Sequence, residues 1–279
     1  MLTLIQIELF KIFKKWRSYI GLIAIAVLVP LIQIAFLIEG NRSVDFMTRN
    51  LQSSFIFVGN FLNGYFISYF ILNSLTVHIP FLVALVAGDL LAGEATAGTY
   101  RIILTRPISR LKLVTSKFLA GILYTFILVF WMALVSLGLG IILFGVGELI
   151  VLSGGGIVIF ERADVLWRFL AAFGFAALSM SLVASLAFLL SSLVENSIGP
   201  IITTMAIIIA FIIISAIDID IFRAIKPYLF TNYMMSWRSF FDSPMDTSDI
   251  LKSLAVILGH ILGFFGLSYW FFRRKDILT

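Results

Sequence analysis

Six long apolar runs constrain this chain more than any other feature of its sequence. Each run has about 20 residues or more, the length that an α-helix needs to cross the hydrocarbon core of a bilayer. The runs are continuously apolar rather than alternating, which favours helices over membrane strands. The expected spans are about 19–38, 66–88, 117–144, 166–190, 198–217 and 250–272. The sequence therefore predicts an all-α membrane protein with six transmembrane helices in a single domain, residues 1–279.

Composition supports the same class of protein. Hydrophobic residues make up 61% of the chain and charged residues only 13%, whereas soluble domains usually have about 45–50% and about 25%. One globular core cannot hide that excess, so lipid is the expected solvent. The chain has no cysteine, which excludes disulfides, thiolate metal sites and cysteine nucleophiles.

The N-terminal segment, residues 1–17, predicts an amphipathic helix lying in the membrane interface. It precedes an apolar run that is too long for a signal peptide and lacks a small-residue cleavage site. Lys11, Lys14 and Lys15 fall mostly opposite the apolar stripe. The residues of that stripe are Leu2, Ile5, Leu9, Ile12, Phe13 and Trp16. The alternative is a helical extension of the first span whose lysines reach to the interface.

Lysine and arginine predict the orientation of the spans. With six spans both termini share one side, and that side carries twelve of the 20 basic residues against five acids. The twelve are Lys11, Lys14, Lys15, Arg17, Arg101, Arg106, Arg110, Lys112, Lys117, Arg273, Arg274 and Lys275. We therefore expect both termini in the cytoplasm, in a cell's inner (cytoplasmic) membrane. Segments 39–52, 145–165 and 218–249 then face outside, with short helices expected at 221–225 and 233–241.

The larger cytoplasmic loop, 89–116, lies between the second and third spans. Residues 95–104 predict a short amphipathic helix, which should end before Pro107 because proline disfavours helical backbone in the residue before it. Ser109 is suited to cap the next helix. The alternative is an ordinary basic loop that only follows the orientation rule.

The order of residues in this loop resembles the loop after the second span in the type-2 ATP-binding-cassette (ABC) permease family. The matching residues are Gly93-Glu94, Gly98-Thr99, Ile103-Leu104-Thr105, Pro107, Ser109-Arg110 and Lys117. The resemblance extends to the interfacial N-terminal helix, the six spans, an outer re-entrant region before the sixth, and the basic ending at 271–276. It implies the transmembrane permease subunit of an ABC transporter, with 95–106 as a cytoplasmic coupling helix that inserts into a separate ATPase subunit.

The resemblance also implies which residues bind that partner. In and beside the coupling helix they are Glu94, Gly98, Thr99, Arg101, Arg106, Pro107, Ser109 and Arg110. Glu195 and Asn196, in the second cytoplasmic loop, would make a smaller contact, or would simply end a span. The implied partners are the ABC ATPase subunit, which binds ATP and Mg, a second permease copy or paralogue that completes a dimer, and membrane lipid.

Enzyme and cofactor motifs are missing from the sequence. The chain has no phosphate-binding loop of the form Gly-x-x-x-x-Gly-Lys-Ser/Thr, so we expect no ATPase activity and no cofactor in this chain. Residues 152–156, Leu-Ser-Gly-Gly-Gly, resemble the start of an ABC ATPase signature by coincidence, because Gly156 replaces a glutamine and the segment lies outside. The basic charge is explained by orientation, so nucleic acid is not an expected partner.

The two histidines, His78 and His260, are too few for a typical zinc site. We expect packing roles: His78 satisfies backbone freed by Pro80, and His260 bonds across helices. Small residues at helical spacing favour close helix packing, with a substrate pathway as the alternative. They are Gly174, Ala177, Ser181 and Ala184.

Three functions remain open. The resemblance favours a permease that couples ATP hydrolysis by its partner to substrate movement. It favours export rather than import. The substrate, and the choice between a homodimer and a heterodimer, are left undetermined. An ABC-like membrane scaffold would instead transmit work to an extracytoplasmic partner. A secondary transporter would need charged sites at mid-membrane depth, and the charges here gather at span ends.

Overall fold

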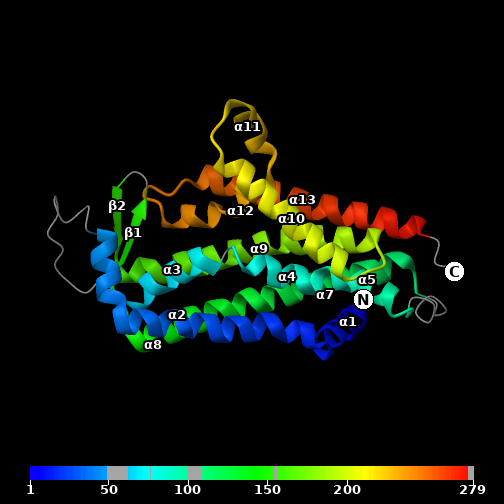
Figure 1. Cartoon of the computed structure of the whole chain (residues 1–279), viewed down its shortest axis with the longest axis horizontal. Coiled ribbons are helices and arrows are strands. Elements are labelled where there is room, and N and C mark those ends of the chain that lie inside the picture. The colour runs from blue at the N-terminus through cyan, green and yellow to red at the C-terminus, as the bar shows by residue number, and fades with distance from the viewer. Residues whose placement is uncertain (49–61, 76, 100–107, 154–155, 276–279) are drawn as a thin grey trace.

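The computed structural model is a bundle of long helices packed around one central helix (Figure 1). It describes residues 1–48, 62–75, 77–99, 108–153 and 156–275. Helix α9 (Arg162–Leu193) is the central one, since 83% of its most apolar stretch is buried. The corresponding share is 17–33% in α2 (Trp16–Thr48), in α10 (Ile198–Ala216), in α13 (Thr247–Arg274) and in the helix that begins with α7 (Arg110–Ala133). These outer helices turn most of their apolar surface outward, as helices solvated by lipid do.

The predicted spans coincide with helices of the structure. Within the described part of the chain, five helices are long and apolar enough to cross a bilayer, and they cover every predicted run except the second. That run is broken into α3 (Gly64–Leu75) and α4 (Ile79–Ala87), which are bent by 55°. Pro80 lies in the first turn of α4, where its missing N–H has no helical partner to lose. A predominantly helical, multi-pass membrane fold is confirmed, and the break is a feature that the apolar pattern did not predict.

The N-terminal segment forms a helix of its own, α1 (Leu2–Lys14), rather than an extension of the first span. Lys15 separates α1 from α2 with an extended backbone (ψ 132°). The predicted apolar stripe holds only in part. Ile12 is 3% exposed, but Leu2 and Trp16 lie at the surface with 77% and 73% of their area exposed. Lys11 of α1 and the following Lys15 turn toward acidic side chains of the bundle rather than away from it.

One turn of π-helix interrupts the third predicted span. Helix α7 passes into η1 (Leu134–Leu139), a π-helical turn, and then into α8 (Gly140–Phe144). The carbonyl oxygen of Ser136 accepts hydrogen bonds from Gln33 Nε2 at 2.9 Å and from Ser68 Oγ at 3.0 Å. Side chains of α2 and α3 thus bind the irregular turn, which is of the single-turn kind in which π-helix usually occurs within α-helices.

Helices α3 and α8 approach each other at a pair of glycines. A Cβ atom on Gly64 would lie 2.6 Å from the carbonyl carbon of Gly140 and from the nitrogen of Ile141. Real Cβ atoms do not approach backbone so closely, so only glycine fits at this crossing.

The end of the bundle away from α1 carries short elements (Figure 1). An antiparallel hairpin, not predicted from the sequence, joins β1 (Leu149–Ser153) to β2 (Gly156–Phe160), with Leu149 opposite Phe160. The short helix expected at 221–225 is confirmed, whereas the range 233–241 holds the end of one short helix and a separate 3-10 turn. The elements between α10 and α13 are α11 (Asp220–Ile225), the 3-10 turn η2 (Lys226–Tyr228), α12 (Phe230–Met234) and the 3-10 turn η3 (Ser236–Phe241).

The small residues of α9 pack closely, with one exception. Ala177, Ser181 and Ala184 are buried, as expected for a helix surrounded by others. Gly174 is exposed instead, and a Cβ atom added there would meet nothing within 4 Å. The predicted packing role of Gly174 is therefore wrong, because its side of α9 faces away from the neighbouring helices.

These two glycines give a direct test of the packing. Replacing Gly64→Ala forces a methyl group into backbone, and overpacking of this kind costs about 1–3 kcal/mol. We expect a lower thermal unfolding midpoint for this variant in detergent. The matched control, Gly174→Ala, adds the same methyl group in open space within a helix and should match or exceed the wild-type midpoint. Equal midpoints for the two variants would contradict the close crossing of α3 and α8.

Candidate functional site

The loop after the second span begins with a helix that starts earlier than predicted. Helix α5 (Asp89–Thr96) follows α4 almost directly, and the chain leaves it at Ala97. Gly98 has a φ of +65°, a conformation that suits glycine and ends helices. The helix expected from residue 95 onward is therefore interrupted at 97–99. The remainder of the predicted coupling helix lies outside the described residues, and so do Arg101, Arg106 and Pro107.

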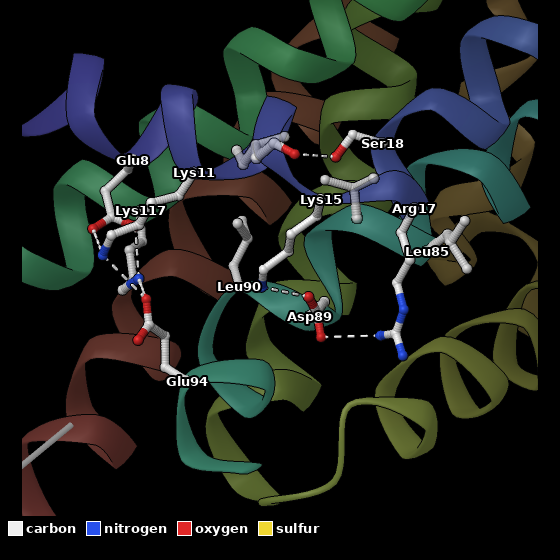
Figure 2. Close-up of a pocket in the computed structure, with 12 residues that line it drawn as sticks. Glu8, Lys11, Lys15, Arg17, Ser18, Leu85, Asp89, Leu90, Glu94 and Lys117 are labelled. Atoms are coloured by element: carbon white, nitrogen blue, oxygen red, sulfur yellow. Dashed lines mark hydrogen bonds and ion pairs between the residues drawn. The ribbon is translucent and has the colours of Figure 1, made fainter. Parts of the chain in front are cut away.

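Glu94, on α5, lies at the centre of an ion-paired group of side chains. Its Oε1 accepts hydrogen bonds from Lys117 Nζ at 2.8 Å and from Lys11 Nζ at 3.2 Å. Glu8 of α1 binds the same two lysines, at 2.7 Å from Lys117 and 2.9 Å from Lys11. Figure 2 shows the two carboxylates and two ammonium groups turned toward one another from three helices. The group joins α1, α5 and α7.

Thr99, one of the predicted site residues, also turns to Glu94. Its hydroxyl bonds to Glu94 Oε2, and its backbone N–H bonds to the Glu94 carbonyl at 3.1 Å. The turn after α5 is thereby folded back onto the carboxylate. Glu94 and Thr99 thus bind within the chain rather than offering free groups at the surface.

Burial makes the pairing of these charges strong. The Lys117 side chain is 1% exposed, that of Glu8 is 8% and that of Glu94 is 12%. Desolvation raises the pKa of Glu94, but the charge and hydrogen bonds of Lys117, the Thr99 hydroxyl and the Lys11 charge outweigh it, so the pKa falls to about 2. Removing one partner of a buried pair leaves an uncompensated charge, at a cost of about 3–5 kcal/mol.

A second group of charges surrounds Asp89, at the start of α5. Lys15 Nζ lies 2.7 Å from Asp89 Oδ2, and Arg17 Nη1 lies 3.1 Å from Oδ1. Arg17 also donates to Ser197 Oγ at 3.1 Å, which connects α2 to the segment before α10. Figure 2 shows Asp89 between the two basic side chains. We call the residues of both groups the charged cluster; they are Glu8, Lys11, Lys15, Arg17, Asp89, Glu94 and Lys117.

The second predicted loop lies beside the first. Thr96 Oγ1 donates to the carbonyl oxygen of Glu195 at 2.5 Å, so the end of α5 is bound to the loop between α9 and α10. Asn196 Oδ1 accepts from the Ile198 N–H at 3.0 Å, which caps the start of α10. The Glu195 carboxylate stays largely exposed, 3.6 Å from Lys275 Nζ. The structure therefore brings the two loops together. Asn196 helps to begin α10 by binding the Ile198 N–H.

Ser109 and Arg110 begin α7. The Ser109 side chain accepts from the Lys112 N–H at 3.3 Å, which confirms the predicted helix cap. Arg110 Nη1 donates to the carbonyl oxygens of Arg273 at 2.7 Å and Lys275 at 3.2 Å. These are the carbonyls that a helix C-terminus leaves without partners, so Arg110 caps α13.

The charged cluster encloses little space. Its residues line a cavity of about 30 Å³, which has room for water but not for a substrate. The acids are already bound to lysine and arginine, and the described residues contain no group of three or more acidic or histidine side chains placed to hold a metal ion. The arrangement is suited to holding helices together rather than to binding a small molecule.

The two histidines make local contacts. His78 Nδ1 lies 3.1 Å from the carbonyl oxygen of Ser74, at the break between α3 and α4. His260 Nδ1 lies 2.8 Å from the Val256 carbonyl of its own helix. The expected hydrogen bond of His260 to another helix is therefore wrong, and its contact across helices is a ring contact with Phe230.

Sequence reasoning missed Glu8, Lys11 and Lys15 as partners of the loop. A signal was present, because Glu8 is the only acid in this largely apolar and basic helix. The register that turns it toward Lys117 depends on tertiary packing, which the helical pattern alone does not specify.

Together, the apolar helices and the charged cluster define a multi-pass helical membrane protein with one ion-paired end. The chain belongs to a family described as a protein of unknown function, DUF2705, whose model matches residues 22–278. The matched range includes Asp89, Glu94 and Lys117 but begins after α1. A search of curated proteins gave no match.

The buried lysine should control the stability of this end of the bundle. Lys117→Met removes the charge that Glu8 and Glu94 share, and we expect a loss of about 3 kcal/mol or more in the free energy of unfolding. The control is Lys15→Met, whose side chain is 48% exposed and whose partner Asp89 keeps Arg17, so its cost should stay within about 1 kcal/mol. Denaturant unfolding in detergent measures both. Similar costs for the two variants would contradict the central place of Lys117.

The contribution of Glu94 should depend on pH. Its pKa is lowered from 4.5 to about 2 in the folded protein, so its ionised form stabilises the fold above pH 4.5, and this contribution is lost as the pH falls toward 2. We expect the difference in unfolding free energy between wild type and Glu94→Gln to be constant above pH 4.5 and to shrink below it. A difference that persists at low pH would show that Glu94 is not the ionised partner of Lys117.

Proposed function

We propose that this chain is the transmembrane permease subunit of an ABC transporter, driven by a separate ATPase subunit that binds ATP and Mg. The support from the sequence is the resemblance of 93–117 to the coupling loop of type-2 ABC permeases. The support from the structure is the charged cluster, which ties that loop to the transmembrane helices. The chain would act in a dimer of two permease subunits, with export as the favoured direction.

The observation that carries the proposal is the position of Glu94. A single carboxylate at the base of the loop binds Lys11 on α1 and Lys117 on α7. Buried, charge-assisted hydrogen bonds are short and directional. A displacement of the loop therefore cannot leave α1 and α7 where they are without separating buried opposite charges.

A mechanism follows from these connections. Closure of the ATPase on its nucleotide would push on residues 95–106, a segment that begins within the last turn of α5. Glu94 would pass the displacement to α7 and α1, and the bond from Thr96 to Glu195 would pass it to the loop that begins α10. Three helices would then move together, as rigid-body switching between inward-facing and outward-facing states requires.

The proposal also implies how the chain is oriented in the membrane. The end of the bundle that carries the charged cluster would lie in the cytoplasm, with α1 in the inner interface of the cytoplasmic membrane. The exposed Leu2 and Phe10 of α1 suit that position, because their apolar surface faces away from the bundle. The C-terminal end of α13 lies at the same end as α1 (Figure 1), so both ends of the chain would share the cytoplasmic side.

The proposal is tested by asking whether a soluble ATPase is encoded beside this gene, and whether that ATPase copurifies with this chain. We expect the pair to copurify, and ATP hydrolysis to require the ATPase subunit. The deletion of 98–106, and the reversals Arg101→Glu and Arg106→Glu, should reduce copurification or uncouple hydrolysis from transport while leaving membrane insertion unchanged. Lys252→Glu, an exposed charge near the start of α13, is the matched control and should behave as wild type.

Two results would overturn the proposal. One is ATP hydrolysis by the purified chain alone. The other is normal ATPase binding and transport by the loop variants. Copurification of an extracytoplasmic protein in place of a transported substrate would favour the mechanical scaffold.

A further inference from the structure

The segment that follows α10 stands out from the side of the helix bundle (Figure 1). It comprises Ile217, Asp218, Ile219, α11 and η2, and α11 has no buried residue. Large apolar side chains cover its surface. Their exposed fractions are 41% for Ile217, 48% for Ile219, 66% for Ile221, 40% for Ile225 and 81% for Tyr228. We call this segment, 217–228, the isoleucine knob.

The charges of the isoleucine knob are paired within it. Arg223 donates to both oxygens of Asp218, from Nε at 2.8 Å and from Nη2 at 2.8 Å, and contacts Asp220 at 3.3 Å. Lys226 lies 3.7 Å from Asp218. Two acids and two bases leave no net charge, so the segment does not require a partner of opposite charge. Its unpartnered feature is the apolar surface.

The length of α10 places the knob at a membrane surface. The helix has 19 residues, a rise of about 28 Å at 1.5 Å per residue, which matches a hydrocarbon core of about 30 Å. α10 begins at Ile198, next to Ser197, which accepts a hydrogen bond from Arg17 of the charged cluster, and it is long enough to reach the opposite face of the bilayer near Ala216. The knob begins at the next residue.

The outward face of α10 leads directly into the knob. Ile209 and Ile213 are 51% and 53% exposed on α10, and a multi-pass membrane protein covers such a surface with lipid. Ile217 follows Ile213 by one helical turn and continues the same surface. The apolar surface of the knob is thus continuous with the lipid-facing surface of the bundle.

We propose that the isoleucine knob inserts its apolar side chains into the interfacial region of the lipid bilayer, on the face away from the charged cluster. Its ligand is the lipid surface itself, and zwitterionic headgroups suffice because the knob is neutral. Amphipathic segments bind this region by burying apolar side chains below the headgroups, and tyrosine is enriched there. The knob thereby fixes the depth of the end of α10. This inference rests on the membrane fold and is independent of the proposed transport role.

The absence of cysteine from the sequence permits a direct experiment. A single Ile221→Cys variant of the full chain is labelled with an environment-sensitive fluorophore and reconstituted in phosphatidylcholine nanodiscs. We expect blue-shifted emission, stronger quenching by lipids with a shallow nitroxide than with a deep one, and weak quenching by aqueous iodide. Addition of anionic phosphatidylglycerol should change none of these values.

Two matched variants calibrate the measurement. Val27→Cys, at an exposed position within the span of α2, should be quenched by the deep nitroxide. Glu195→Cys, whose side chain is 77% exposed, should be quenched by iodide. Iodide quenching of position 221 equal to that of position 195 would overturn the proposal. Disulfide formation between two Ile221→Cys chains, with quenching by neither reagent, would overturn it too and assign the knob to an interface between copies.

Discussion

The buried ammonium group of Lys117 is the interaction on which the rest of this structure depends. It lies inside α7 with 1% of its side chain exposed, and it is stable there because Glu8 and Glu94 approach it from two other helices. A charge so far from water requires its partners to stay in place. One requirement for charge neutrality thus fixes three features: the position of α1, the start of the loop after α4, and the first turns of α7.

Ion pairs stabilise the end of the bundle that carries α1, whereas close backbone contact stabilises the bundle nearer its other end. There α3 and α8 are held by the glycine crossing and by side-chain bonds to the π-turn carbonyl of Ser136. Lipid gives helices little hydrophobic reason to associate, so close backbone contact and buried polar bonds do that work. Ion pairs hold the helices together at the end of the bundle that carries α1. Small residues and neutral hydrogen bonds hold them together within the apolar part.

Apolar length predicted most of the fold, because a run of about 20 apolar residues has few alternatives to a membrane helix. Local sequence signals predicted the cap at Ser109 and a short helix before α13, because local chemistry decides the structure there. It missed the break before Pro80 and the hairpin at 149–160, since a continuous apolar run reads alike whether it bends or not. Of the candidate site, the sequence indicated Glu94 and Thr99, but the pairing of Glu94 with Lys11 of α1 came only from packing. Partner binding by Arg110 stays a prediction. What the sequence did not indicate is that Arg110 caps α13, where a helix end leaves carbonyls that a nearby arginine can satisfy.

Helix α9 shows how the bundle can be assembled in the order of synthesis. It leaves the ribosome after α4 and α7, which pack against it, but before α10 and α13, so part of its surface first meets lipid. Ser181 and Ser185 donate to carbonyl oxygens of their own helix, at 2.8 Å and 2.6 Å. Those hydroxyls need no neighbour to become satisfied. The most enclosed helix of the protein can therefore remain in the bilayer beside its earlier neighbours, with these two hydroxyls already bonded, until α10 and α13 are made.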